Sequence, residues 1–323
     1  MSQLIEDEVL KIYNTLIENK YESYFVGGSV RNLLIEKTIK DWDIATSATP
    51  EQVQILFPDS FYDNDFGTVG VPYTDNDHKK VIEITTFRTE TTYSNNRHPD
   101  AVSWGKTIEE DLERRDFTMN AIALKLNSNS LDKISDHQII DPYNGRKDIK
   151  NKLIRAVRNP DLRFKEDALR IMRAIRFASE LDFEIEENTW EAIVANTPLI
   201  ANISYERIRD ELLKILSAKN ALKGIELLDK SGILEIILPE LIQGKGLSQV
   251  RPGRHHTTDV FTHNLMTMHH TPNPDPIVKL ASLLHDVGKP YVVSSDPDGH
   301  VIFYNHEVKG SEIAAIIATR LRL

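Results

Sequence analysis

The stretch Tyr24-Phe25-Val26-Gly27-Gly28-Ser29-Val30-Arg31, followed ten residues later by Asp41-Trp42-Asp43, decides the fold of this chain. Tyr24 to Val26 has the character of a short buried strand that stops at the paired glycines, and residues 30–34 resume a helical pattern. Residues 41–45 alternate polar and apolar side chains, as a half-buried strand does. Strand and helix signals in this order predict an α/β or α+β head.

The flanking sequence extends this alternation to about residue 145. Apolar spacing predicts a helix over residues 5–20, and Thr49-Pro50 predicts the capped start of another. Strands are expected at 68–73 and 80–87.

Beyond residue 145 the strand signals vanish. Successive helices are expected at 164–180, 188–196, 204–218 and 220–230. A third region, which begins near residue 251, holds eight of the eleven histidines. We therefore expect a head (1–145), a helical neck and body (146–250) and a histidine-rich domain (251–323). The sequence stops at Leu323 inside a helical pattern, so we expect a truncated fragment.

Composition narrows the function. The 323 residues include no cysteine, which excludes disulfides, thiol catalysis and cysteine-ligated metals. No apolar run approaches the roughly 18–20 residues of a membrane span, and the N-terminus is acidic where a signal peptide is basic, so we expect a cytoplasmic protein without a membrane partner. The net charge is −10, yet residues 146–176 contain eleven basic and four acidic side chains. Such a segment is either a solvated helix face or a local surface for RNA.

Asp41 and Asp43 are the first candidates for catalysis. Side chains two apart on a strand point to the same face, and paired carboxylates suit Mg²⁺. The Gly27-Gly28 turn upstream lets backbone N–H groups approach a phosphate, and Arg31 is a candidate contact for a triphosphate. Glu83 is either a third carboxylate near the metal or a solvent-facing strand residue.

The chain resembles the bacterial (class II) family of CCA-adding tRNA nucleotidyltransferases and poly(A) polymerases. The motifs that carry the resemblance are Gly27-Gly28-Ser29-Val30-Arg31, Asp41-Trp42-Asp43, Arg114-Arg115-Asp116-Phe117-Thr118-Met119-Asn120-Ala121, Asp141-Pro142-Tyr143-Asn144-Gly145 and Glu166-Asp167-Ala168-Leu169-Arg170. They occur in consistent order over residues 20–245. The resemblance implies an α+β fold, with a polymerase-β-like mixed-sheet head followed by an all-helical neck and body.

The resemblance also implies an activity. An RNA 3′-hydroxyl would attack the α-phosphate of CTP or ATP at the tRNA acceptor end, with pyrophosphate leaving and metal ions held by Asp41 and Asp43. It places one arginine of the pair Arg114/Arg115 near the triphosphate, without saying which. It places Asp116 and Asn120, expected at i and i+4 of a helix, near the ribose.

Asp167 and Arg170 are candidates for choosing the base. On a helix they would lie on one face and present an acceptor beside a donor. Cytosine and adenine each present an amino donor beside a ring acceptor, whereas uracil and guanine have the reverse polarity and would leave the pair mismatched. The alternative is an ordinary helix salt bridge. Arg173 and Arg176 continue the three-residue spacing and are candidates for holding the triphosphate.

The polar segment from Arg88 to Gly105 is expected to be a mobile loop. It is similar to the flexible loop of family members that add the terminal A.

The histidine-rich region resembles the start of an HD-type phosphohydrolase domain. His263, the vicinal pair His285-Asp286 and His306 form an alternative second site for a divalent transition metal. The resemblance places the last metal ligand of such a domain beyond Leu323.

Three other functions remain open from the sequence. One is a poly(A) polymerase or A-adding enzyme of the same family. Another is a metal-dependent phosphohydrolase with a degenerate head, and the third is a tRNA-binding module without catalysis. The oligomeric state is not encoded in any pattern recognised here.

Overall fold

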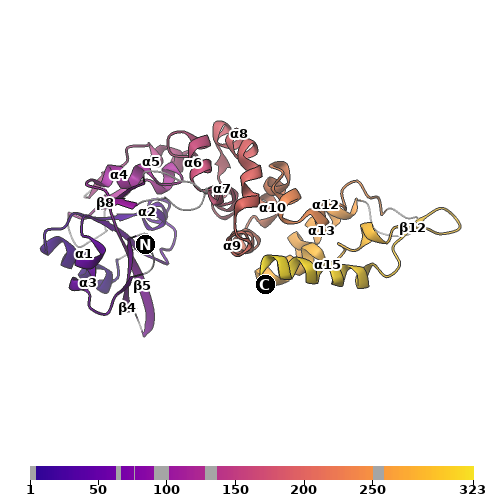
Figure 1. Ribbon diagram of the computed structural model, residues 1–323, viewed down its shortest axis with the longest axis horizontal. Helices are drawn as coiled ribbons and strands as arrows, with labels where there is room; N and C mark the ends of the chain where they lie inside the picture. Colours follow the sequence, from indigo (N-terminus) through magenta and orange to yellow (C-terminus); the bar gives the residue numbers. More distant parts are fainter. Residues whose placement is uncertain (1–4, 63–66, 76, 91–101, 128–136, 250–257) are drawn as a thin grey trace. The chain divides into compact units, whose positions relative to one another are not determined.

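The computed structural model describes residues 5–62, 67–75, 77–90, 102–127, 137–249 and 258–323. The chain divides into two compact units, Met1–Glu166 and Asp167–Leu323, and each is described by itself. The boundary expected at residue 145 therefore falls inside the first unit. Figure 1 labels the elements in chain order, with most of the first unit in indigo and purple.

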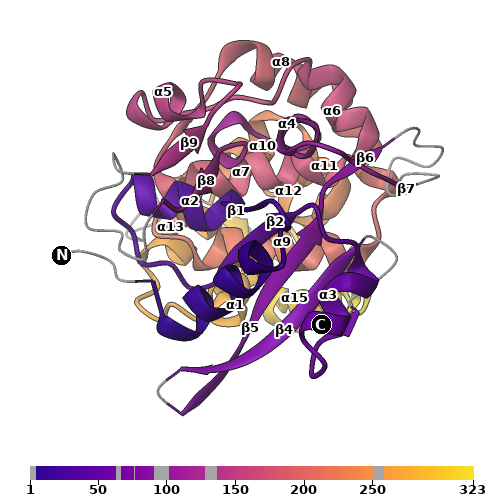
Figure 2. The same cartoon turned by 90° about the vertical axis from the view of Figure 1, so that its left-hand side faces the viewer.

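A seven-stranded mixed sheet forms the centre of unit 1, in the order β3-β4-β5-β2-β1-β8-β9. The strands are β1 (Ser23–Val26), β2 (Asp43–Thr46), β3 (Phe61–Tyr62), β4 (Thr68–Asp75), β5 (His78–Thr86), β8 (Ala123–Lys125) and β9 (Gln138–Ile140). The β2–β5 pair is parallel and the other pairs are antiparallel. The strands expected at 68–73 and 80–87 are confirmed as β4 and β5, which form the long hairpin seen in Figure 2.

The helices of unit 1 are α1 (Asp7–Glu18), α2 (Gly27–Leu34), α3 (Pro50–Leu56), α4 (Ile108–Glu113), η1 (Thr118–Asn120), α5 (Gly145–Lys150) and α6 (Pro160–Glu166). Short strands β6 (Arg88–Glu90), β7 (Val102–Trp104) and β10 (Leu153–Ile154) complete the unit. The expected cap is confirmed, because Thr49 forms a capping box with Gln52 at the start of α3. Ile108 and Leu112 of α4 pack into a core cluster with Tyr24 and Val26 of β1, which fixes α4 beside the end of that strand.

Unit 2 is predominantly helical. It contains α7 (Leu169–Leu181), β11 (Glu184–Ile185), α8 (Glu187–Asn196), η3 (Thr197–Asn202), α9 (Tyr205–Ser217), α10 (Ala221–Lys230), α11 (Ile233–Ile237), α12 (Pro239–Ile242), α13 (Val260–His270), α14 (Pro276–Leu284), η4 (Lys289–Tyr291), β12 (Ser294–Ser295), β13 (Val301–Ile302) and α15 (His306–Leu321). Helix α7 packs against α9 and α10, while α14 packs against α9 and α13. Among the described residues, no helix combines the length and apolar character needed to span a membrane.

Four expectations are corrected here. The strand expected over 41–45 begins only at Asp43. The helix expected at 116–120 is a 3-10 turn. The continuous helix expected over 164–180 is interrupted at residues 167–168. Two-residue strands persist beyond residue 145, because strands of this length leave almost no alternating pattern in the sequence.

Candidate functional site

The glycine turn joins β1 to α2 and is closely surrounded. Gly27 has a φ of +69°, a conformation that side-chain-bearing residues rarely adopt. A Cβ placed on Gly27 would lie 3.0 Å from Arg115 Nη1 and 3.2 Å from Asp43 Oδ2. The hydroxyl of Ser29 donates a hydrogen bond to the carbonyl of Val26 (2.7 Å) and tightens the turn. The absence of a side chain at Gly27 therefore lets a guanidinium and a carboxylate approach the turn together.

Three carboxylates occupy neighbouring positions of the sheet. Asp41 is exposed and lies in a bend just before β2, while half-buried Asp43 begins that strand. The intervening Trp42 is 4% exposed, so it is more buried than either aspartate. Asp43 is the register partner of Glu83 across the parallel β2–β5 pair. This register places the carboxylate of the adjacent strand beside Asp43.

The environment of Asp43 disfavours its charged form. Burial and the nearby carboxylate of Glu83 are the main causes, and together with Asp41 they raise the pKa of Asp43 to about 7 despite the opposing charges of Arg115 and Arg31. Like charges held this close are destabilising unless a cation or a proton offsets them. Carboxylate oxygens are the kind of ligand that a hard divalent cation prefers.

Asp111 holds the two consecutive arginines. Its side chain is fully buried near the end of α4, whose first turn is fixed by a capping box at Thr107. Arg114 donates from Nε and Nη2 to Asp111 Oδ1 (3.0 and 2.7 Å), and Arg115 donates from the same two nitrogens to Oδ2 (3.2 and 2.9 Å). Burial opposes ionisation of Asp111, but the two arginine charges and their hydrogen bonds outweigh it and lower its pKa.

Arg31, Asn120 and Asp116 form a buried chain of hydrogen bonds. Arg31 Nη1 donates to Asn120 Oδ1 (2.7 Å), and Asn120 Nδ2 donates to Asp116 Oδ1 (3.1 Å). The expected pairing of Asp116 with Asn120 is therefore present, although a 3-10 turn rather than an α-helix brings them together. The structure connects this pair to the glycine turn through Arg31 of α2.

The motif from Asp141 to Gly145 has a structural role, because it positions the 3-10 turn η1. Asp141 accepts hydrogen bonds from the backbone N–H groups of Gly145 (2.6 Å) and Arg146 (3.0 Å) at the start of α5. A Cβ on Gly145 would lie 2.1 Å from the carbonyl oxygen of Thr118, so only glycine fits. The hydroxyl of Thr118 donates to buried Asp148 (2.7 Å), which ties α5 to η1.

In unit 2, Asp167 lies before α7 rather than on it. Its carboxylate accepts a hydrogen bond from the backbone N–H of Leu169 (3.1 Å), the first residue of the helix. Arg207 of α9 donates from Nη2 to the same carboxylate (3.0 and 3.3 Å). Arg170 is buried in the first turn of α7. Asp167 therefore lies in the turn before the helix that carries Arg170, and not on that helix as expected.

Arg173 and Arg176 both lie over the ring of Phe177, at 5.5 and 4.4 Å from its centroid. Arg176 also pairs with buried Glu211 of α9 (3.1 Å). Arg176 therefore joins α7 to α9, whatever further contact it makes.

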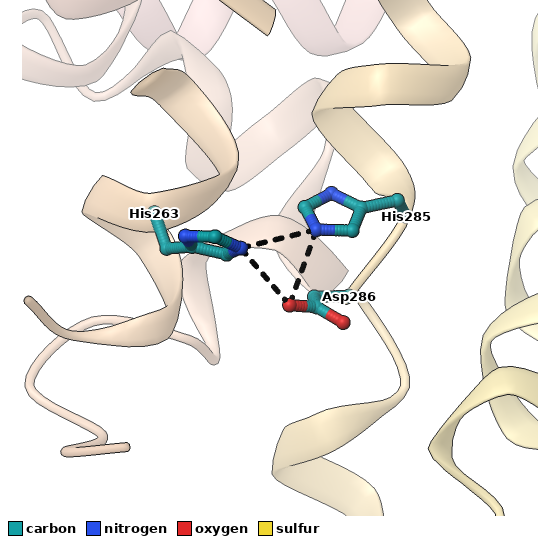
Figure 3. A group of neighbouring side chains, drawn as sticks. All are labelled: His263, His285 and Asp286. Carbon is teal, nitrogen blue, oxygen red and sulfur yellow. Dashed lines mark hydrogen bonds and ion pairs between the residues drawn. The ribbon is translucent and has the colours of Figure 1, made fainter. Parts of the chain in front are cut away.

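A histidine–aspartate cluster gathers elsewhere in unit 2 (Figure 3). His263 Nε2 and His285 Nε2 lie 3.2 Å apart, and they lie 3.4 and 3.2 Å from Asp286 Oδ2. His306 Nε2 lies 3.4 Å from the other carboxylate oxygen. The four residues predicted from their spacing are therefore together, and the ligand atoms of His263, His285 and Asp286 all lie within 4.8 Å of one another.

The cluster faces a cavity of about 560 Å³. Buried Lys289 donates to Asp286 Oδ2 (2.6 Å) and to Gln249 Oε1 (2.8 Å). Burial opposes ionisation of Asp286, but hydrogen bonds from His285 and Lys289 keep its pKa well below the usual range. The hydrogen bond to Asp286 raises the pKa of His285. Two imidazoles and a carboxylate suit a divalent transition metal.

Three residues of these sites have roles that the sequence did not predict: Asp111, Asp148 and Arg207. Asp111 had a detectable signal, since an acid three and four residues before two arginines lies on their side of a helix. Asp148 and Arg207 contact residues that are distant along the chain, and no local sequence pattern predicts such contacts. Residues 91–101 of the loop expected at 88–105 lie outside the described residues, and its two ends pair as antiparallel strands β6 and β7.

Comparison with known protein families matches two regions of the chain. Residues 23–155 match the family described as the poly A polymerase head domain. Residues 182–244 match the family described as a probable RNA and SrmB-binding site of polymerase A.

Curated relatives are similar over about seven tenths of the chain. A CCA-adding enzyme of Geobacillus thermodenitrificans is 44% identical over 238 residues, which are 73% of this chain and 55% of the relative. A CCA-adding enzyme of Ligilactobacillus salivarius is 47% identical over 220 residues, 68% of this chain and 51% of the relative. The chain thus spans about half the length of the curated relatives it matches.

Among solved structures, the chain is similar to the Bacillus stearothermophilus CCA-adding enzyme in complex with CTP. The TM-score is 0.66 at 31% sequence identity, and the match covers 99% of this chain and 71% of the other. The Thermotoga maritima CCA-adding enzyme complexed with tRNA matches with a TM-score of 0.64 at 23% identity, and it supports the fold alone.

Proposed function

Given that the chain belongs to the bacterial family of CCA-adding enzymes and poly(A) polymerases, we propose that it adds CCA to the 3′ end of tRNA from CTP and ATP, releasing pyrophosphate. The observation that carries the proposal is the carboxylate of Asp43, which lies with Arg115 beside the Gly27 turn and is the register partner of Glu83 on the adjacent strand. Such substrates place the activity in the cytoplasm. A poly(A) polymerase or an A-adding enzyme would use the same site.

The chemistry needs a divalent cation, which we propose to be Mg²⁺ held by Asp41 and Asp43. When bound there, it would lower the pKa of the attacking hydroxyl and neutralise charge on the phosphates. The raised pKa of Asp43 supports this assignment, because a cation relieves the repulsion that raises it. Gly27 and Gly28 would admit the triphosphate to the turn, and Arg31 would hold Asn120 and Asp116 in place for the ribose.

For the choice of base, we propose Asp167 and Arg170 of unit 2. The carboxylate of Asp167 would accept a hydrogen bond from the amino group of cytosine or adenine, and Arg170 would donate to the neighbouring ring nitrogen. Arg207 would fix the orientation of Asp167 through the hydrogen bonds it donates. Arg173 remains a candidate for the triphosphate.

The tRNA acceptor end would meet the basic segment. Arg146, Lys147, Lys150 and Lys152, on and just after α5, are exposed to solvent. Exposed cations on one short element suit backbone phosphates, and binding through them falls with salt because counterions are released.

A second candidate function rests on the cluster of His263, His285, Asp286 and His306, which we propose to bind a divalent transition metal. A metal held there would activate water for hydrolysis of a phosphate ester. Mutation separates the two sites: His285→Ala would lower metal binding by unit 2, whereas Asp43→Asn would not.

The experiment that tests the main proposal uses tRNA lacking its terminal CCA, incubated with CTP, ATP, GTP and UTP singly and together. We expect CC from CTP alone and CCA from CTP with ATP. Long A tails without C would favour a poly(A) polymerase. Incorporation of GTP or UTP as readily as CTP would contradict base choice by Asp167 and Arg170.

A further inference from the structure

We propose that Asp111 is a positioning residue that aims Arg115, rather than Arg114, at the triphosphate; the inference rests on the proposed function. Asp111 itself would touch no substrate. It would act by fixing the orientation of one guanidinium beside the glycine turn.

The hydrogen bonds define which nitrogen of Arg115 is presented. Asp111 engages Nε and Nη2 of this arginine, so Nη1 is the nitrogen that it leaves for another partner. That same Nη1 lies 3.0 Å from the position of a Cβ on Gly27, and Asp43 Oδ2 lies 3.2 Å from the same position. Nη1 of Arg115 and Oδ2 of Asp43, the proposed metal ligand, therefore both lie close to one point of the turn.

The contact with Asp111 would favour nucleotide binding by keeping the Arg115 side chain in one orientation. An arginine side chain that is free to rotate loses conformational entropy when it is ordered. Here the two-point contact with a fully buried carboxylate orders the guanidinium before a nucleotide arrives. Leu112 beside Asp111 is also fully buried, so the helix that carries the clamp is fixed in the core.

Charge balance favours the same role. Asp111 carries one negative charge against the two positive charges of Arg114 and Arg115. The Arg115 guanidinium brings its positive charge to the Gly27 turn, where an anionic phosphate would be received. Arg115, whose charge acts on Asp43, is the arginine nearer to the carboxylates.

If Asp111 served only to stabilise the fold, its replacement would not act on nucleotide affinity through Arg115. A double-mutant cycle separates this structural role from the proposed positioning role. The variants are Asp111→Asn, Arg115→Gln, Arg114→Gln and the doubles that combine Asp111→Asn with either arginine change. The double Asp111→Asn with Arg114→Gln keeps the local net charge of the wild type, which guards against loss of folding. The readouts are the KM and kcat for CTP and ATP, the Kd for each nucleotide, and the thermal midpoint.

We expect Asp111→Asn to raise the KM and Kd for both nucleotides about ten- to hundredfold, the range for a lost charge-assisted contact. The KM for tRNA should stay within about twofold, and the same increase should appear in the Arg114→Gln background. In the Arg115→Gln background, Asp111→Asn should have no further effect on nucleotide affinity. An equal loss in both arginine backgrounds, or an unchanged nucleotide Kd in a folded Asp111→Asn variant, would overturn the inference. If the wild type binds nucleotides but does not extend tRNA, the proposed function fails, while the Kd cycle still decides the role of Asp111.

Discussion

Replacing Asp43 with asparagine should stabilise the metal-free protein while abolishing its activity. The pKa of Asp43 is about 7 in the folded protein against an ordinary value of 3.8, so folding favours the protonated carboxyl. This stabilising contribution is present in full below about pH 4 and is lost as the pH rises through 7. At about 1.4 kcal/mol for each pH unit, the ionised carboxylate costs up to about 4 kcal/mol at pH 8. Asparagine avoids this cost because it never ionises.

Calorimetric unfolding in EDTA at pH 5 and pH 8 measures the effect. The advantage of Asp43→Asn should grow by about 2–3 kcal/mol between the two pH values, or roughly 5–10 °C in the transition that includes unit 1. Addition of Mg²⁺ at pH 8 should raise the Tm of the wild type more than that of the variant. Asp41→Asn is the matched control, and its effect should be smaller because Asp41 is exposed. A variant that is less stable than the wild type at pH 8, or a difference independent of pH, would refute this reasoning.

Three further predictions concern the turn, the base and the RNA. Gly27→Ala should lower the affinity for CTP and ATP at least about tenfold. The new Cβ would press on Arg115 Nη1 and Asp43 Oδ2, and a φ of +69° is strained for alanine. Nucleotide titration measures the affinity, and an unchanged value would contradict the prediction. Arg207→Gln should reduce discrimination against GTP and UTP about tenfold, because it releases the carboxylate of Asp167. Competition assays with mixed nucleotides measure the ratio of correct to incorrect nucleotide incorporated. This ratio stays constant if Arg207 has no such role. Changing Lys147 and Lys150 together to glutamine should make the binding of tRNA less dependent on salt. The slope of the logarithm of the tRNA binding constant against the logarithm of the salt concentration should become smaller by about 1.5–2, as expected for two lost phosphate contacts. An unaltered slope would exclude α5 from the RNA surface.

Features set by local sequence were predictable here. The strand before Gly27 and the capped helix after Thr49 both follow from backbone conformation and side-chain pattern over a few residues. The helix predicted to carry Asp116 and Asn120 is a 3-10 turn at residues 118–120, yet the two side chains are hydrogen-bonded.

Features set by competing local bonds or distant contacts were not predictable. Helical spacing placed Asp167 and Arg170 on one face, but the aspartate side chain bonds the backbone at Leu169 and ends the preceding helix. The partner of Asp167, Arg207, lies 40 residues away on α9. The spacing of His263, His285 and His306 indicated a cluster, yet only the packing of α13 against α14 brings the first two together.

The central claim is that nucleotide transfer takes place at the carboxylates of unit 1 with a divalent cation. Extension of tRNA lacking CCA by the wild type, by Asp43→Asn and by Asp59→Asn, an exposed turn residue of the same unit, tests it most directly. We predict that the wild type and Asp59→Asn add CCA only when a divalent cation is present, and that Asp43→Asn loses several orders of magnitude in rate. Extension by Asp43→Asn at a rate near that of the wild type would contradict the account.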